Sequence, residues 1–476
     1  MTFSYDIIII GAGIAGPALA HSLSLIRPKD APPLRIALLE RSLTKPDRIV
    51  GELLQPGGMN ALKELGLQWC TEGIDAKPTY GYCVVYEGKQ VHIPYPNGAQ
   101  GRSFHHGSFV MNLREAASKA RGVDVIEATV NELIECPLTG RVLGVRATRK
   151  TKDVPPYTES FFGELIIAAD GCYSKFRSQV TQQTPVTKSN FMGAILENAQ
   201  LPISNHGTVV LVPGSGPLPA DTKAHVRNIV VPALPDALRK PVLESLEKDR
   251  LRGMPNSFLP AAKQGHSKEG LILIGDAWNM RHPLTGGGMT VALNDVVILT
   301  RLLTPFLSEA NPELEASAAP TTITLDWDQI SDALSAWHWS RKGLSSTINI
   351  LSVALYDLFG ADDINLHILR AGCFAYFERG GDCIHGPVSL LAGLAPSPVL
   401  LARHFFAVAF YSIYIHFTTP LVASNKGKLG DDDEDDKLLR QFSFGEYPAY
   451  IFRCFTVFWT ACIVFGPLVW SEIRWW

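Results

Sequence analysis

The chain has 476 residues, which is enough for two or three lobes around a large hydrophobic core. Its formal net charge of −3 argues against a nucleic acid as a partner, because proteins that bind phosphate backbones present a basic surface. The eight cysteines are scattered without a Cys-x-x-Cys pair, so the sequence indicates neither a metal site nor a disulfide framework.

The first predicted element is a strand at Asp6–Ile10 that leads into a glycine-rich turn at 11–16 and then a helix. This Gly-x-Gly-x-x-Gly spacing is typical of a turn that binds a dinucleotide. Gly11 makes the turn, Gly13 leaves room for a pyrophosphate, and Gly16 lets the helix pack closely on the strand.

The next predicted strand, Ile36–Leu39, ends at Glu40, whose carboxylate is placed to bind the adenosine ribose. These residues alone fit either NAD or FAD. A proline- and glycine-rich stretch follows at 46–58, in which Arg48 is a candidate phosphate partner and Gln55 a candidate contact of the ring system. The alternative for this stretch is a surface loop with a solvated arginine.

Two strand-like runs, Tyr82–Tyr86 and Gln90–Ile93, flank Glu87-Gly88 and predict a hairpin. Tyr82 is either a core aromatic or a hydroxyl in a pocket. A helix is expected at Asn112–Ala120, in which Arg114 is a candidate partner of the cofactor phosphates.

Further along, Val130 follows a predicted strand at Val123–Ile126 and is expected to close the adenine side. Leu165–Ala168 reads as another buried strand, and Asp170 lies just beyond it. A carboxylate at that place lies where ligands bind in doubly wound sheets, and it can also cap the next turn.

A second glycine-rich corner begins with a predicted strand at Leu271–Ile274 and Asp276, whose carboxylate can accept hydrogen bonds from sugar-like hydroxyls. After Gly286–Gly288 a helix is expected to start near Met289. The positive end of a helix would stabilise the negative charge of a reduced flavin.

Residues 186–264 are expected to form a second lobe, with strand-like runs at Thr208–Val212 and Asn228–Val231 and a helix at Asp236–Arg250. The sequence contains no second strand–Gly-x-Gly-x-x-Gly–helix unit. It therefore predicts that the chain lacks an NADPH-binding domain of its own.

The C-terminal part, from 328 onward, is mostly helical by its periodicity and includes apolar stretches at Val399–Ala423 and Cys454–Trp470. Since a spanning helix needs about 20 apolar residues, neither stretch is a clean span. We expect a helical pair that lies in or dips into one leaflet, with a buried core hairpin as the alternative.

Five motifs, at 11–16, 46–58, 169–177, 275–293 and 376–388, resemble the squalene monooxygenase (squalene epoxidase) family. The resemblance implies an FAD-dependent enzyme that converts squalene and O2 to (S)-2,3-oxidosqualene in sterol (ergosterol) biosynthesis. It further implies electrons from NADPH through a separate membrane reductase, and an endoplasmic reticulum membrane location with the catalytic domain on the cytosolic side.

The same resemblance assigns site residues. It implies FAD contacts at Ile14, Ala15, Glu40, Arg41, Arg48, Leu53, Arg114, Val130, Asp276 and Met289. The motifs themselves add the cofactor-binding candidates Gly11, Gly13, Gly16, Asp170 and Gly288. Tyr82 and Gln55 match a tyrosine–glutamine pair beside the flavin and are the candidate catalytic residues.

The expected fold class is α/β: a Rossmann-like FAD-binding domain of the para-hydroxybenzoate-hydroxylase type, a β-rich substrate lobe and a C-terminal helical membrane-associated region. The expected segments are 1–80, 111–185 and 265–325 for the FAD-binding domain, 81–110 for a substrate-lobe hairpin, 186–264 for a shortened substrate domain, and 326–476 for the membrane-associated region.

One departure from the family lies between Val212 and Asp221, where a further β-rich stretch is replaced by Pro-Gly-Ser-Gly-Pro-Leu-Pro. Two strands of the sheet that roofs the pocket are therefore expected to be missing. This leaves two alternatives open: a related flavoprotein that acts on another polyprenyl or terpenoid chain, and a non-catalytic prenyl-binding protein on the same fold.

Overall fold

The computed structural model of the chain describes residues 4–48, 50–151, 154–212, 219–248, 251–308, 323–360, 363–418 and 447–473. A parallel sheet forms the centre of an α/β body, with the strands in the spatial order β8, β2, β1, β10, β14. Their bounds are β1 (Tyr5–Ile10), β2 (Ile36–Glu40), β8 (Val123–Glu135), β10 (Val154–Ala168) and β14 (Leu271–Leu273).

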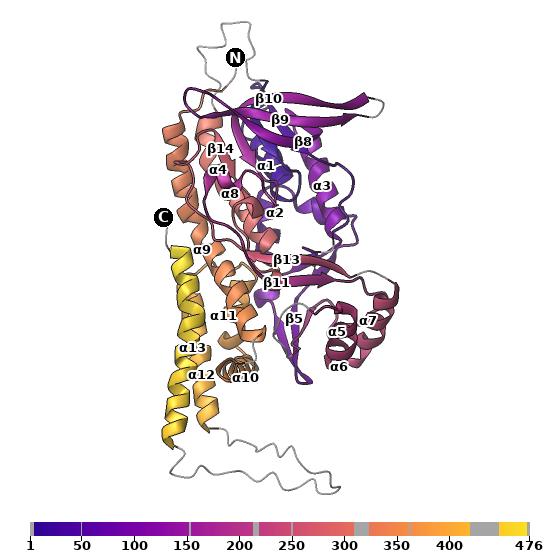
Figure 1. Cartoon of the computed structure of the whole chain (residues 1–476), viewed down its shortest axis with the longest axis vertical. Helices are drawn as coiled ribbons and strands as arrows, with labels where there is room; N and C mark the ends of the chain where they lie inside the picture. Colours follow the sequence, from indigo (N-terminus) through magenta and orange to yellow (C-terminus); the bar gives the residue numbers. More distant parts are fainter. Residues whose placement is uncertain are drawn as a thin grey trace.

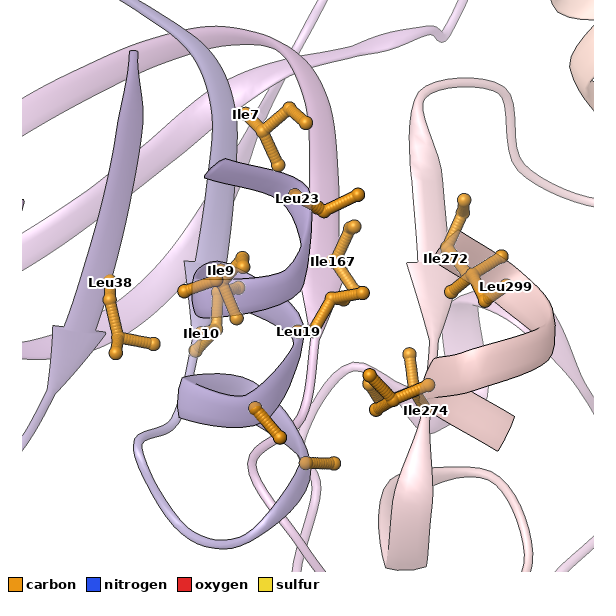
Figure 2. Packing of buried hydrophobic residues seen from close by; sticks show 14 of the residues in the cluster. Ile7, Ile9, Ile10, Leu19, Leu23, Leu38, Ile167, Ile272, Ile274 and Leu299 are labelled. Carbon is orange, nitrogen blue, oxygen red and sulfur yellow. The ribbon is translucent and has the colours of Figure 1, made fainter. Parts of the chain in front are cut away.

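The central strands are apolar because they are buried within the body. Ile7, Ile9, Ile167 and Ile272 are fully buried, and Figure 2 shows Ile167 beside Leu19 of the first helix and Ile272 beside Leu299. Helices α1 (Ala15–Ser24), α3 (His106–Ser118) and α8 (Gly288–Leu307) belong to this body, and α2 (Pro56–Glu64) packs on α8. The predicted α/β body is thus confirmed, while its division into the six expected segments stays a prediction.

β8 and β10 are long because each takes part in two ladders. Their outer halves pair antiparallel with β9 (Val142–Thr151), while their inner halves belong to the parallel sheet. The antiparallel sheet of β8, β9 and β10 therefore shares two continuous strands, β8 and β10, with the parallel sheet.

The lobe below the body in Figure 1 contains three small sheets. The predicted hairpin is confirmed as β5 (Gly81–Tyr86) and β6 (Lys89–Pro94), and β12 (Gly207–Val210) joins β5 in parallel. The other two sheets consist of β3 (Leu53–Leu54), β7 (Gly101–Ser103) and β4 (Lys77–Thr79), and of β11 (Val186–Gly193) with β13 (Arg252–Phe258). The short remaining elements are α4 (Arg177–Val180), η1 (Gln68–Thr71), η2 (Pro96–Gly98), η4 (Gly275–Ala277) and η5 (Pro283–Thr285).

The prediction of a strand at Asn228–Val231 is wrong, because this run lies in a helical segment. Asp221 caps its start, accepting a 2.9 Å hydrogen bond from the main-chain N–H of Ala224. The segment continues as α5 (Thr222–His225), η3 (Val226–Val230), α6 (Val231–Ala233) and α7 (Asp236–Lys248). Residues 213–218, which hold most of the departure from the family pattern, lie outside the described residues.

The described residues of the C-terminal part form five helices: α9 (Trp327–Gly360), α10 (Ile364–Glu378), α11 (Asp382–Leu391), α12 (Pro398–Thr418) and α13 (Tyr447–Ile473). In Figure 1, α12 and α13 lie side by side and extend away from the α/β body. The expectation that neither apolar stretch is a clean span is wrong as far as length and composition are concerned. By length and composition, α12 and residues Pro448–Ile473 of α13 can each cross a membrane.

Candidate functional site

A cavity of about 510 Å³ lies where the two glycine-rich corners meet. Parallel strands β1 and β14 end at this place, and helices α1 and α8 begin there, as expected for a ligand site in a doubly wound sheet. The predicted residues that line it are Gly13, Ile14, Ala15, Arg48, Leu53, Tyr82, Asp276, Gly288 and Met289.

The first corner is shaped by its glycines. Gly11 has a φ of +99°, and a Cβ on Gly16 would lie 1.9 Å from the carbonyl oxygen of Gly11. A side chain at either position would therefore break the turn. Gly13 differs, because a Cβ there would meet no atom within 4 Å. Its backbone faces open space, so a bulky ligand can approach it.

Glu40 and Arg114 both bind the main chain of Ala12 in this corner, and neither side chain lines the cavity. Glu40 accepts a 2.7 Å hydrogen bond at Oε2 from the N–H of Ala12. Arg114 Nε donates to the carbonyl oxygen of Ala12 at 2.8 Å, and its Nη2 lies 3.7 Å from Glu40 Oε2. Both side chains hold the loop that faces the cavity, and direct contact of either with the cofactor stays a prediction.

Asp170 lies between cavity-lining neighbours at the end of β10. Its Oδ1 is buried with no hydrogen-bond partner within the described ranges. Burial raises the pKa of this carboxyl group. An unpartnered buried acceptor at the carboxyl end of a strand fits a ligand that supplies hydroxyl or N–H donors.

Arg177 joins the turn after β10 to the second glycine corner. Its Nε donates to the carbonyl oxygen of Ala277 at 2.8 Å, and its Nη2 donates to those of Asp276 at 3.0 Å and Cys172 at 2.9 Å. The position of the Asp276 main chain is therefore fixed by a charged group, while the residue itself lines the cavity.

Two further basic side chains line the cavity. His106 Nδ1 lies 3.1 Å from the carbonyl oxygen of Gly51, and burial lowers the pKa of this histidine to about 4, with nearby Arg48 acting in the same direction. Burial also lowers the pKa of Arg281 to about 10, an effect that Asp276 opposes. His106 is therefore neutral at pH 7. The described residues contain no cluster of side chains that could hold a metal ion.

Gln55 and Tyr82 form a fixed hydrogen-bonded set at the substrate-lobe end of the cavity. Gln55 Nε2 donates to the carbonyl oxygen of Thr285 at 2.7 Å and also to the hydroxyl of Tyr82. The hydroxyl of Tyr95 donates to Gln55 Oε1 at 2.6 Å. Because a carbonyl only accepts, Thr285 settles which end of the amide is nitrogen, so Tyr82 accepts and its own hydrogen is left to point elsewhere.

The remaining predicted residues lie outside the cavity lining. Gln55 is fully buried behind Tyr82, Arg41 is exposed, and Val130 is a buried residue of β8 that pairs with Ala147. The structure therefore brings most of the predicted site residues together around the cavity, whereas Gln55, Arg41 and Val130 do not line it.

Sequence reasoning missed Arg177, Arg281 and Tyr95 as site residues. Arg177 lies in the same motif as Asp170, and Arg281 lies in the same motif as Asp276. This shared position in the sequence could have indicated that both arginines belong to the site. Tyr95 gave no such signal, because its partner Gln55 is 40 residues away in the sequence.

The donor set and the shape fit an FAD molecule. Two helix N-termini and an open glycine at Gly13 suit phosphate and flavin groups, and the acceptors Asp170 and Asp276 suit hydroxyl groups.

The family model described as squalene epoxidase matches residues 162–220 and 215–427. A squalene epoxidase (erg1) of Aspergillus fumigatus is 41% identical, over 98% of this chain and 93% of the relative. A squalene monooxygenase of Mus musculus is 38% identical, over 98% of this chain and 78% of the relative.

Solved structures with the same fold are more distant in sequence. The p-nitrophenol 4-monooxygenase PnpA of Pseudomonas putida superposes with a TM-score of 0.61 at 14% identity, covering 83% of this chain and 99% of that one. PqsL of Pseudomonas aeruginosa, described as a probable FAD-dependent monooxygenase, gives 0.56 at 18% identity, covering 79% and 100%. At these identities the likeness concerns the fold.

Proposed function

The chain belongs to the squalene epoxidase family, and from this membership we propose that it is an FAD-dependent monooxygenase that epoxidises squalene to (S)-2,3-oxidosqualene. One oxygen atom of O2 enters the terminal double bond, and the other leaves as water after two electrons and two protons have been supplied. The observation that carries the proposal is the cavity itself, which joins both glycine corners to Tyr82 in one space.

FAD would be held by the two corners of the cavity. Gly13 and the start of α1 would receive the pyrophosphate, while Asp276 and the start of α8 would receive the other half of the cofactor. When bound, reduced FAD supplies the activation of O2 that no amino-acid side chain provides. The proposed reaction requires no acid–base pair from the protein.

The chain's own residues would exclude water and orient the alkene. Leu53, Met280 and Leu284 line the cavity beside Tyr82 and offer apolar contact to a hydrocarbon. Dry surroundings favour transfer of oxygen to the substrate over its loss as hydrogen peroxide. Tyr82, held as an acceptor by Gln55, can direct its hydroxyl hydrogen toward the cavity.

Electrons would come from NADPH through a separate membrane-bound reductase, since the sequence has one Gly-x-Gly-x-x-Gly unit and that unit is assigned to FAD.

The outer faces of α12 and α13 support a membrane location. Large apolar side chains there, including Phe410 and Phe452, are more than half exposed. We propose the endoplasmic reticulum membrane, with the catalytic body on the cytosolic side.

The test is a reconstituted assay with the full chain in detergent, FAD, NADPH, an NADPH-dependent reductase and squalene under labelled O2. We expect labelled 2,3-oxidosqualene in amounts that follow NADPH consumption. Bound flavin with hydrogen peroxide as the sole product would contradict the proposal.

The helical segment that follows β12 favours a second candidate of the same class. The described residues show the helical elements α5, η3 and α6 where a strand at Asn228–Val231 was expected. A different pocket roof would suit another polyprenyl or terpenoid chain. Parallel incubations with several such lipids separate the two candidates, because the true substrate is the one that suppresses peroxide release.

A further inference from the structure

The C-terminal end of α13 contains a buried carboxylate, Glu472, that is 2% exposed. Its Oε2 accepts from Lys342 Nζ at 3.1 Å and from Ser346 Oγ at 2.9 Å, and its Oε1 accepts from Asn349 Nδ2 at 2.8 Å. All three donors lie on α9, and Figure 1 shows the end of α13 beside that helix. A membrane-associated helix is thus anchored to α9 by polar contacts that point inward.

This cluster continues to the second glycine corner. Asn349 Nδ2 lies 3.4 Å from Asn279 Oδ1, which also accepts from Arg281 Nη2 at 2.7 Å and from Arg341 Nη2 at 2.9 Å. Arg281 lines the cavity and its Nη1 donates to the carbonyl oxygen of Gly288, the first residue of α8, at 3.3 Å. A connected set of side chains therefore runs from α13 to the cavity wall.

A second ion pair ties α9 to α8. Arg341 of α9 donates to Asp295 of α8 at 2.7 Å and 2.6 Å, and its guanidinium lies 4.5 Å from the ring centre of Trp278. The side chains of the pair are 1% and 3% exposed. α9 is thus fixed on one side to the helix that starts at the cavity and on the other side to the end of α13.

Burial of charge argues that Glu472 does more than fill space. An apolar residue at this position would pack without the cost of desolvating a carboxylate, and buried ion pairs are often no more stable than such packing. What the ion pair between Lys342 and Glu472 provides is one fixed alignment of α13 against α9. Any other alignment would leave buried charged groups without partners, which is strongly disfavoured.

We propose that Glu472 is a positioning residue of the cofactor cavity, acting through Asn349 and Asn279 on Arg281. When Glu472 holds the Asn349 amide, Asn279 Oδ1 accepts hydrogen bonds from Arg281 and Arg341. The Arg281 guanidinium then stays at the cavity wall. Without the carboxylate, the Asn349 amide competes for Asn279, and Lys342 loses its counter-charge. This inference rests on the proposed function in taking FAD as the ligand of the cavity.

The experiment measures FAD affinity of the full chain in detergent, by titration of the flavin-free protein. We expect Glu472→Gln to weaken FAD binding at least ten-fold, Glu472→Asp to bind more tightly than Glu472→Gln, and the KM for squalene to stay unchanged. The matched control is Glu247→Gln, which removes an exposed carboxylate paired with Arg227 on the distant lobe. It should bind FAD like the unmodified protein.

A double variant, Lys342→Met with Glu472→Leu, guards against misfolding, because it leaves no unpaired charge. It lacks the acceptor for Asn349, so it should also lose affinity. Unmodified FAD affinity in a folded Glu472→Gln or double variant would overturn the inference while leaving the proposed function intact. An unmodified chain that binds no FAD would overturn both, whereas one that binds FAD without forming oxidosqualene contradicts the proposed function alone.

Discussion

The guanidinium of Arg177 and the carbonyl oxygen of Ala277 lie 2.8 Å apart across 100 residues of sequence. This bond and its neighbour to Asp276 join the turn after β10 to the turn after β14. Arg177→Met would leave buried carbonyl groups without donors, so we expect a loss of about 3 kcal/mol in the free energy of unfolding. Denaturant titration measures it, and FAD affinity should fall in parallel. Arg177→Lys should recover only part of both, because an ammonium cannot reach several carbonyl groups at once.

Tyr95 should control turnover without affecting cofactor binding. Tyr95→Phe removes the donor to Gln55 Oε1 and leaves this buried amide oxygen unpaired, which loosens the hydrogen-bonded set that positions Tyr82. We expect kcat to fall several-fold at unchanged FAD affinity. Tyr80→Phe, at a tyrosine that is 38% exposed, is the control. Equal kcat values for the two variants would show that the Tyr95 hydroxyl has no part in catalysis.

Asp276 should be required to retain the flavin. The side chain lines the cavity, and its main chain is held by Arg177, so Asp276→Asn alters the charge without freeing the turn. A hydrogen bond to a charged acceptor contributes about 1.5–3 kcal/mol, which predicts a roughly ten- to hundred-fold weaker FAD affinity. The flavin absorbance of the purified protein measures this, and full occupancy in the variant would refute the role.

Acid should destabilise the fold through two buried histidines. Burial lowers the pKa of His106 and of His282 to about 4, below the value of about 6.5 expected in the unfolded chain. His282 Nδ1 accepts from the N–H of Leu284 at 3.2 Å, so protonation breaks that bond.

Because the unfolded state binds the proton more readily, this stability is present above pH 6.5 and is lost as the pH falls toward 4. The loss amounts to at most about 3 kcal/mol for each histidine. Thermal melts across this range measure it. His282→Gln should flatten the dependence, whereas a substitution at exposed His225 should not.

The outward face of α13 should determine membrane binding. Phe452, Phe455 and Trp459 are 67%, 63% and 57% exposed and lie on one helical face. Changing all three to Gln removes about 1.5–3 kcal/mol of apolar transfer for each, so much of the protein should move to the soluble fraction with its flavin retained. The control Val457→Ala changes a fully buried position and should affect stability only. Complete membrane recovery of the triple variant would place the anchor elsewhere.

Local patterns predicted the α/β body well. The glycine turn after β1 and the Glu87-Gly88 hairpin each depend on neighbouring residues, which is why they could be recognised. The run Asn228–Val231 misled, because its three β-branched apolar residues fit a helix as well as a strand, and the cap at Asp221 decides between the two.

The outer parts of the site could not be predicted because they depend on distant contacts. Arg114 donates to the Ala12 carbonyl, a contact that the sequence did not indicate, because only the folded chain brings the two together. In α13, charged residues at both ends made the apolar stretch look too short. Glu472 is buried against α9, however, so the helix extends beyond the stretch counted from the sequence.

The acceptor that orients Gln55 belongs to the peptide backbone of Thr285. Mutation can replace a side chain but cannot delete a carbonyl, so the orientation of the Gln55 amide is insulated from sequence drift at that position. Evolution can therefore reshape the cavity around residue 285 without reversing the amide, while the opposite contact, from the Tyr95 hydroxyl, is open to loss by a single substitution.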